Sequence, residues 1–102
     1  MVLVRPPGHA SISVVRSADG TALSTAAHGP ADARVTLLLA HGWCLDSTSW
    51  DPVLPLLLDR PDPPRIVTYD HRGHGRSGRD HRVAVRGGRA SIATLADDLA
   101  TV

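Results

Sequence analysis

The run Val35–Ala40, Val-Thr-Leu-Leu-Leu-Ala, constrains the fold of this chain more than any other feature. A strand with one face in water alternates apolar and polar residues, whereas this run is apolar at almost every position. Such a pattern is typical of a strand covered on both faces, as in a parallel sheet. A second strand is predicted at Arg65–Asp70, where β-branched residues predominate. The intervening residues 41–64 are enough for the crossover that two parallel strands need.

That crossover is predicted to contain a helix. Its apolar residues recur at helical spacing and are expected to pack on the sheet; they are Trp50, Val53, Leu54, Leu57 and Leu58. Four consecutive residues could cap its first turn: Asp46, Ser47, Thr48 and Ser49. Pro52 is tolerated in a first turn, but Pro55 removes a backbone donor and is expected to bend the helix.

Two further patterns complete the predicted order of elements. Strand-like stretches at 12–17 and 21–29 flank an Asp-Gly turn signal and predict an antiparallel hairpin. A second helix is expected to begin near Ser91, with Ile92, Leu95 and Leu99 on one face. The order hairpin, strand, helix, strand, loop, helix predicts an α/β fold with a mixed sheet.

Composition limits the class of protein. At 102 residues the chain is expected to form one domain, with residues 1–9 as an amino-terminal tail and 10–102 as the folded part. The net charge of +1 argues against a nucleic-acid-binding protein, and the arginines from Arg72 to Arg89 are interpreted as a solvated loop. Cys44 is the only cysteine, and no apolar run approaches a membrane span. A cytoplasmic protein that binds neither nucleic acid nor membrane is expected.

The last six residues of Tyr69–Gly78 spell Gly-x-Gly-x-x-Gly, the pattern of a dinucleotide-binding turn. Such a site needs a helix that begins at the glycines, because the free N–H groups of that helix hold the pyrophosphate. Here the next helix is expected about a dozen residues later, and Asp97, at the spacing of a ribose-binding acid, falls inside it. The glycines are therefore interpreted as a structural turn.

Two separated motifs together resemble a known family. "LLLAHGWCLDSTSW" followed by "RIVTYDHRGHGRSG" is similar to the amino-terminal part of α/β-hydrolase-fold enzymes, which carry His-Gly-x after the third strand and Asp-x-Arg-Gly-x-Gly-x-Ser after the fourth. The resemblance covers 11–102 and implies the first part of a three-layer α/β domain, truncated before the nucleophile elbow. An aromatic residue at Trp43 looks more like the esterases, lactonases, perhydrolases and epoxide hydrolases than the haloalkane dehalogenases.

The resemblance assigns roles position by position. His41 and Gly42 would form the oxyanion loop, and the backbone N–H of Trp43 would be one of the two donors of the oxyanion hole. The second motif would shape the neighbouring loop without performing chemistry; its matching residues are Asp70, Arg72, Gly73, Gly75 and Ser77. No cofactor or metal is implied.

The chain carries no catalytic residue that the resemblance can assign. The nucleophile elbow, Gly-x-Ser-x-Gly, does not occur; the nearest match, at Gly75–Arg79, has its second glycine one position early. The resemblance implies an esterase-like hydrolase that, when complete, acts on a small-molecule substrate such as a carboxylic ester through a Ser-His-Asp triad. This chain alone is expected to be inactive. The alternative is a non-catalytic remnant or partner-binding module, and an unpaired edge at Val35–Ala40 is expected to favour self-association.

Other reactive residues receive structural interpretations. The histidines near the two motifs are expected to be solvated rather than metal ligands or bases. Cys44 is interpreted as a small buried hydrophobe, and Ser77 as a turn serine that hydrogen-bonds nearby backbone.

Overall fold

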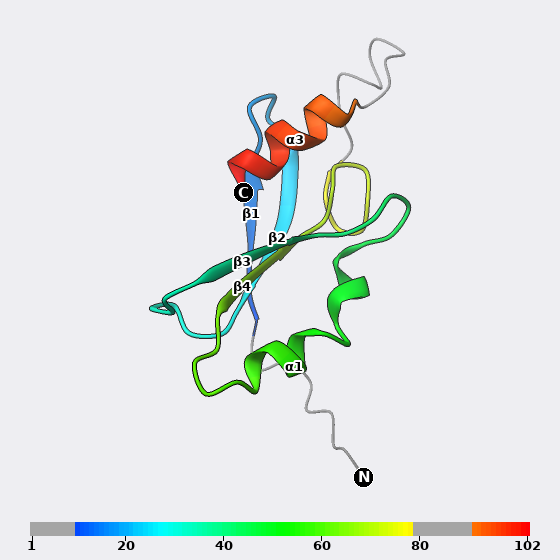
Figure 1. Cartoon of the computed structure of the whole chain (residues 1–102). Helices are drawn as coiled ribbons and strands as arrows, with labels where there is room; N and C mark the ends of the chain where they lie inside the picture. The colour runs from blue at the N-terminus through cyan, green and yellow to red at the C-terminus, as the bar shows by residue number, and fades with distance from the viewer. Residues whose placement is uncertain (1–9, 79–90) are drawn as a thin grey trace.

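The computed structural model describes residues 10–78 and 91–102, and within them it contains a four-stranded mixed sheet (Figure 1). The strand order is β1-β2-β4-β3. β1 pairs antiparallel with β2, β2 antiparallel with β4, and β3 parallel with β4. The predicted α/β class and mixed sheet are confirmed. The expected tail, residues 1–9, lies outside the described residues.

The predicted hairpin consists of β1 (Ser11–Arg16) and β2 (Ala22–His28). The turn between them closes at Gly20, which has a φ of 86°, a left-handed conformation that glycine adopts without steric cost. The Asp19 carboxylate accepts hydrogen bonds from the Ser17 hydroxyl at 2.5 Å and the Thr21 N–H at 3.0 Å. The Asp-Gly signal therefore located the turn correctly.

The predicted parallel pair is β3 (Thr36–Ala40) and β4 (Arg65–Tyr69). β4 lies inside the sheet, with Ile66 and Tyr69 almost completely buried. β3 lies at the end of the sheet and is less covered than its apolar sequence predicts, since Leu38 keeps 39% of its surface exposed.

The crossover differs from the single bent helix that its spacing predicts. It contains a 3-10 helix, η1 (Ser47–Trp50), and a separate five-residue helix, α1 (Leu54–Leu58). Asp46 caps η1 by accepting from the Thr48 N–H at 2.9 Å. The expected bend is instead a break, because Pro52 and Pro55 both lack an N–H and Pro55 can only stand in a first turn. Leu54 joins the core, while Leu56 points to solvent.

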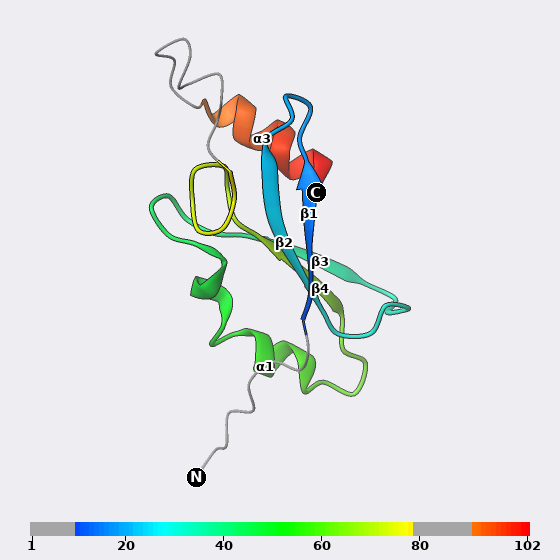
Figure 2. The ribbon, with the colours of Figure 1, turned by 180° about the vertical axis from the view of Figure 1, so that it is seen from behind.

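The last described element is α3 (Ile92–Thr101), which begins near Ser91 as expected; the Ser91 hydroxyl caps it by accepting from the Thr94 N–H at 3.1 Å. Figures 1 and 2 show α3 next to the turn of the hairpin and α1 near the opposite end of the sheet. The predicted apolar face of α3 is not its most buried one, because Ile92 is 81% exposed whereas Asp98 is 1% exposed. No helix in 10–78 or 91–102 is long and apolar enough to cross a membrane.

Candidate functional site

The two motifs of the sequence meet at one edge of the sheet. Ala40, the last residue of β3, pairs with Tyr69, the last residue of β4. Because these strands are parallel, the loops that follow them begin side by side. We call them the 41–45 loop and the 70–78 loop. They border an open depression of about 500 Å³ whose lining includes Cys44, His74 and Gly75.

The 41–45 loop is a tight turn. The Leu45 N–H donates to the Gly42 carbonyl at 3.1 Å, and Cys44 has a φ of 64°, the only positive φ of a non-glycine residue in the described ranges. A positive φ at the third position of such a turn normally belongs to glycine or asparagine. Trp43 occupies the second position with 65% of its surface exposed. The N–H of Trp43 makes no hydrogen bond within residues 10–78 and 91–102.

The direction of this N–H is fixed through its own peptide unit. The Gly42 carbonyl accepts from Leu45 and also lies 2.7 Å from Nδ1 of His41. In a trans peptide the carbonyl and the following N–H point in opposite directions, and the described residues contain no cis bond. Two hydrogen bonds on the Gly42 oxygen therefore aim the Trp43 N–H away from the loop.

Three histidines, His41, His71 and His74, connect the two loops through hydrogen bonds. Nε2 of His41 accepts from the His71 N–H at 2.9 Å, while Nε2 of His71 lies 3.0 Å from the His41 carbonyl. Nε2 of His74 accepts from the Cys44 N–H at 3.2 Å, while its Nδ1 lies 2.9 Å from the Arg72 carbonyl.

This pattern assigns the tautomers. A ring nitrogen that accepts a hydrogen bond carries no proton, and one that faces a carbonyl must carry it. His41 and His74 are therefore neutral with the proton on Nδ1, and His71 donates from Nε2. The expectation that these histidines are solvated is wrong for His41, which is 5% exposed, and His71 and His74 are half-buried. Burial is also the main reason that the pKa of His71 is lowered.

The 70–78 loop folds around a carboxylate of the chain itself. Asp70 is buried and accepts from the Ser47 N–H at 2.7 Å and the Arg76 N–H at 3.0 Å. A Cβ on Gly75 would lie 2.5 Å from the Asp70 carboxyl group, so only glycine fits there. The backbone donors that could cradle a phosphate thus face an internal anion. This geometry explains the glycines without a ligand.

Ser77 fastens the same loop to the sheet. Its hydroxyl donates to the Asp70 carbonyl at 2.6 Å and accepts from the Ser24 N–H of β2 at 2.9 Å. The sequence predicted a serine bonded to nearby backbone, and the second contact, with a strand 53 positions away, was not foreseen. Both hydroxyl functions are engaged in structural bonds.

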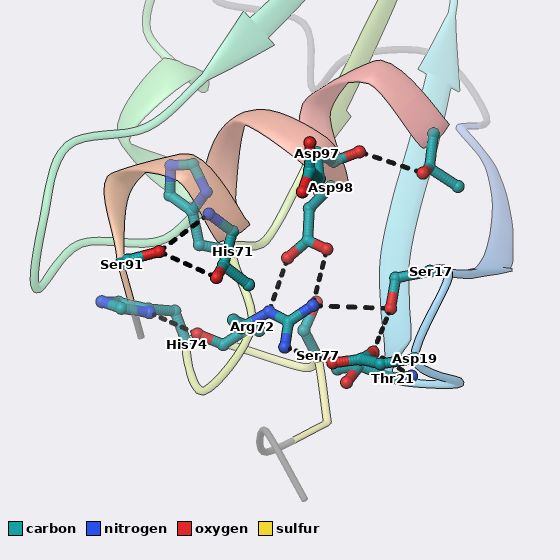
Figure 3. A network of polar contacts seen from close by, with 12 residues as sticks. Ser17, Asp19, Thr21, His71, Arg72, His74, Ser77, Ser91, Asp97 and Asp98 are labelled. Carbon is teal, nitrogen blue, oxygen red and sulfur yellow. Dashed lines mark hydrogen bonds and ion pairs between the residues drawn. The ribbon is translucent and has the colours of Figure 1, made fainter. Parts of the chain in front are cut away.

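Arg72 corrects the interpretation of the arginine cluster. Its side chain is buried rather than solvated, and it forms two parallel bonds to Asp98 of α3, from Nε and Nη2, each of 2.7 Å. Nη1 also donates to Asp19 at 2.7 Å. Figure 3 shows the guanidinium between α3 and the hairpin turn. The Arg72 charge, with help from Ser17, holds the pKa of Asp19 well below its usual range. The other predicted loop arginines, except Arg76, lie outside the described residues.

Sequence reasoning missed Asp98 and Asp19 as partners of Arg72. Asp97 and Asp98 are adjacent, and only the rotation of α3 decides that Asp98 faces the loop. Cys44 also differs from its predicted buried state, because it is exposed at the tip of the turn. In 10–78 and 91–102, no three histidine, cysteine or acidic side chains form a group suited to a metal ion.

Comparisons with known proteins define the class to which this geometry belongs. The chain belongs to the α/β-hydrolase fold superfamily and matches the amino-terminal part of that fold. It is 44% identical over 73 residues to the provisionally assigned carbamate hydrolase RutD of Agrobacterium fabrum, covering 71% of this chain and 25% of the relative. It is 40% identical over 63 residues to the bifunctional esterase/perhydrolase DCH of Acinetobacter calcoaceticus, covering 62% and 22%.

A solved structure agrees. The superposition on a hydrolase from Pseudomonas aeruginosa has a TM-score of 0.70 at 27% identity, covering 88% of this chain and 30% of that one. No protein-family model matches the chain. The chain spans about a quarter of the length of the curated relatives it matches.

Proposed function

We propose that the chain is the amino-terminal, oxyanion-loop part of an α/β-fold hydrolase that acts on carboxylic esters or related small molecules. The observation that carries this proposal is the Trp43 N–H, which is unbonded within the described ranges and held in a fixed direction at the carboxyl end of β3. A preorganised donor of this kind stabilises the charge that develops on a carbonyl oxygen during acyl transfer.

The complete reaction requires groups that this chain does not supply. A Ser-His-Asp triad would provide the nucleophile, the base and the residue that orients the base, and the residue after the nucleophile would give the second oxyanion donor. His41 and His74 do not serve as that base, because both ring nitrogens of each hold backbone groups. His71 holds a backbone carbonyl through Nε2, and its other nitrogen, Nδ1, is buried without a hydrogen-bond partner in the described residues. The activities after which two of the relatives are named, carbamate hydrolase and esterase/perhydrolase, support chemistry at an acyl centre. A cytoplasmic location, with which the single cysteine is compatible, belongs to the same proposal.

To test this proposal, the reading frame is extended beyond Val102, and the longer protein is assayed for hydrolysis of p-nitrophenyl acetate. The extended protein is expected to contain a strand followed by Gly-x-Ser-x-Gly and to turn over the ester, whereas the 102-residue chain is expected to match the buffer rate. An extension without that motif, together with stable expression of the short chain, would instead support a non-catalytic module.

A pair of variants of the extended protein isolates the oxyanion donor. Trp43→Pro deletes the N–H, and proline suits the second position of this turn. We expect kcat to fall by about 100-fold to 1,000-fold, the effect of removing one oxyanion donor. Trp43→Ala keeps the N–H and removes only the exposed ring, so its kcat should stay within a few-fold of the parent. Equal losses in both variants would contradict the backbone role.

A further inference from the structure

We propose that His74 is a positioning residue that sets the conformation of the 41–45 loop and thereby the direction of the Trp43 N–H; this inference rests on the proposed function. His74 lies in the other loop, and the resemblance assigns it no role. Its imidazole contacts the 41–45 loop at two places. Nε2 accepts from the Cys44 N–H at 3.2 Å, and the ring packs edge-on against Trp43 with centroids 5.0 Å apart.

The hydrogen bond falls where the loop is strained. Cys44 has a φ of 64°, and a side chain bearing a Cβ adopts this conformation only when its surroundings impose it. Cys44 is the third residue of the turn that the Leu45 N–H closes on the Gly42 carbonyl. Relaxation of Cys44 would break that bond and free the peptide unit that carries the Trp43 N–H. An acceptor on the Cys44 N–H therefore opposes the relaxation that would turn the oxyanion donor away.

His74 is itself held in place from behind. Its Nδ1 donates to the Arg72 carbonyl at 2.9 Å, and Arg72 is anchored by Asp98 and Asp19. The ion network in Figure 3 is thus connected to the 41–45 loop through one backbone carbonyl and one imidazole. Through this connection, the buried ion network helps to fix the position of His74 and thus the conformation of the 41–45 loop.

The arrangement requires a neutral imidazole, because a proton on Nε2 would replace the acceptor of the Cys44 N–H by a second donor. Among the described residues, the titratable groups nearest His74 are the imidazoles of His41 and His71, with ring centroids at 5.3 and 6.1 Å, and the Asp46 carboxyl and Cys44 thiol, which border the same depression. Acidification is expected to release Cys44 when His74 takes up its second proton.

The test measures amide hydrogen exchange and proton chemical shifts of Cys44 by NMR in the full 102-residue chain. His74→Phe keeps an aromatic ring against Trp43 and removes the acceptor. We expect the amide hydrogen of Cys44 to exchange about tenfold faster in this variant, because the variant loses one hydrogen bond of ordinary strength. His74→Gln offers a side-chain oxygen to the same N–H and should restore slow exchange. His28→Phe removes an imidazole at the opposite end of β4 and should leave Cys44 unchanged.

The pH dependence separates positioning from general stabilisation. In the parent chain the Cys44 amide shift should follow the titration of the His74 ring protons, and in His74→Gln this dependence should disappear while slow exchange remains. If His74→Phe does not fold, the His74→Gln comparison alone decides. A Cys44 amide that ignores the His74 titration, or that exchanges equally in parent and His74→Phe, would overturn the proposal.

Activity of the extended protein provides an independent arm. His74→Phe should lower kcat more than it raises KM, and His74→Gln should recover most of kcat, because the variants change the donor rather than substrate binding. An extended protein with no esterase activity would refute the proposed function, yet the NMR result would still decide whether His74 positions the loop.

Discussion

Two glycines of the 70–78 loop have positive φ values for different reasons. Gly73, with a φ of 72°, has no atom within 4 Å of the place where a Cβ would stand. Gly75, with a φ of 49°, has the Asp70 carboxyl group 2.5 Å from that place. The first glycine relieves only backbone strain, while the second also makes room for the buried carboxylate.

This difference predicts unequal effects of the same substitution. Gly73→Ala should lower the free energy of unfolding by about 1 kcal/mol, the cost of a left-handed conformation for a residue with a Cβ. Gly75→Ala should lower it by about 1–3 kcal/mol more, because the new methyl group also displaces Asp70. Urea unfolding followed by tryptophan fluorescence measures both. Equal losses would show that the loop accommodates the methyl group and that the close approach to Asp70 is unimportant.

At the residue scale, the sequence identified the structurally important positions but did not identify most of the residues that they contact. The spacing of the second motif picked out Asp70, Arg72, Gly75 and Ser77, and each of them makes a specific structural contact. The partners Asp98, Asp19 and Ser24 could not be predicted, because they depend on the rotation of α3 and on how the hairpin packs. No sequence pattern predicted the role of His74, because that role depends on the left-handed conformation of Cys44 in another loop.

At the scale of elements, Arg72 connects three segments that are far apart in sequence. The 70–78 loop contributes the arginine, α3 contributes Asp98, and the hairpin turn contributes Asp19. Removing one member of a buried ion pair is costly, because the remaining charge is left without compensation in a poorly solvated place. The docking of α3, whose apolar residues Ile92 and Leu99 are 81% and 38% exposed, therefore depends on this charge.

A matched pair of arginine variants tests this dependence. Arg72→Met should lower the free energy of unfolding by about 3–5 kcal/mol or abolish cooperative unfolding. Arg76→Met, in the same loop but exposed, should change it by less than about 0.5 kcal/mol. Circular dichroism during urea unfolding gives both values. A loss for Arg72→Met no larger than for Arg76→Met would mean that α3 is held by other contacts.

Element predictions succeeded where the pattern of apolar residues was unambiguous. The four strands were located from β-rich runs bounded by turn residues, and the start of the last helix near Ser91 was also located. The crossover was harder, because helical spacing predicted one helix while Pro52 and Pro55 imposed a break. For helix α3 the prediction of a helix was correct, but the predicted buried face was wrong. A buried ion pair, rather than the apolar residues, determines which side of α3 faces the 70–78 loop.

At the scale of the whole molecule, shifted pKa values make stability depend on pH, among them those of His28, His71 and Asp19. Burial lowers the pKa of His28 and His71 from the ordinary 6.5, so the unfolded chain binds protons first as pH falls below about 6.5. Their contribution to stability is complete above that pH and is lost below it. Arg72 lowers the pKa of Asp19 from 3.8, so the contribution of that carboxylate is lost as pH falls below about 4.

Thermal unfolding between pH 8 and 3 should therefore show two separate decreases in midpoint, one below about pH 6.5 and one below about pH 4. His28→Phe removes one of the buried imidazoles and should reduce the first decrease while leaving the second unchanged. Nδ1 of His28 has no hydrogen-bond partner within the described residues, so little polar bonding is lost with the ring. If the midpoint temperature of unfolding stays constant from pH 7 to 5, the pKa values of these histidines are the same in the folded and unfolded states.

The open end of the sheet predicts how the isolated chain behaves in solution. β3 pairs with β4 on one side, and its other side has no strand partner in the described ranges. Val35 and Leu38 are 57% and 39% exposed there, so an unpaired parallel edge carries apolar side chains. The other end, β1, also exposes apolar side chains, Ile12 and Val14 at 61% each, but it carries the charge of Arg16, which opposes edge pairing. Association is therefore expected through β3 rather than β1.

Light scattering on a concentration series tests which edge associates. The parent chain should form oligomers that increase with concentration, and Leu38→Lys should return it toward the monomer, because a charge on an edge strand opposes pairing. Ile12→Lys places the same charge on β1, where Ile12 is 61% exposed, and should leave the oligomers in place. If Ile12→Lys disperses them and Leu38→Lys does not, β1 is the contact. A parent that stays monomeric at all concentrations would show that the β3 edge is already protected.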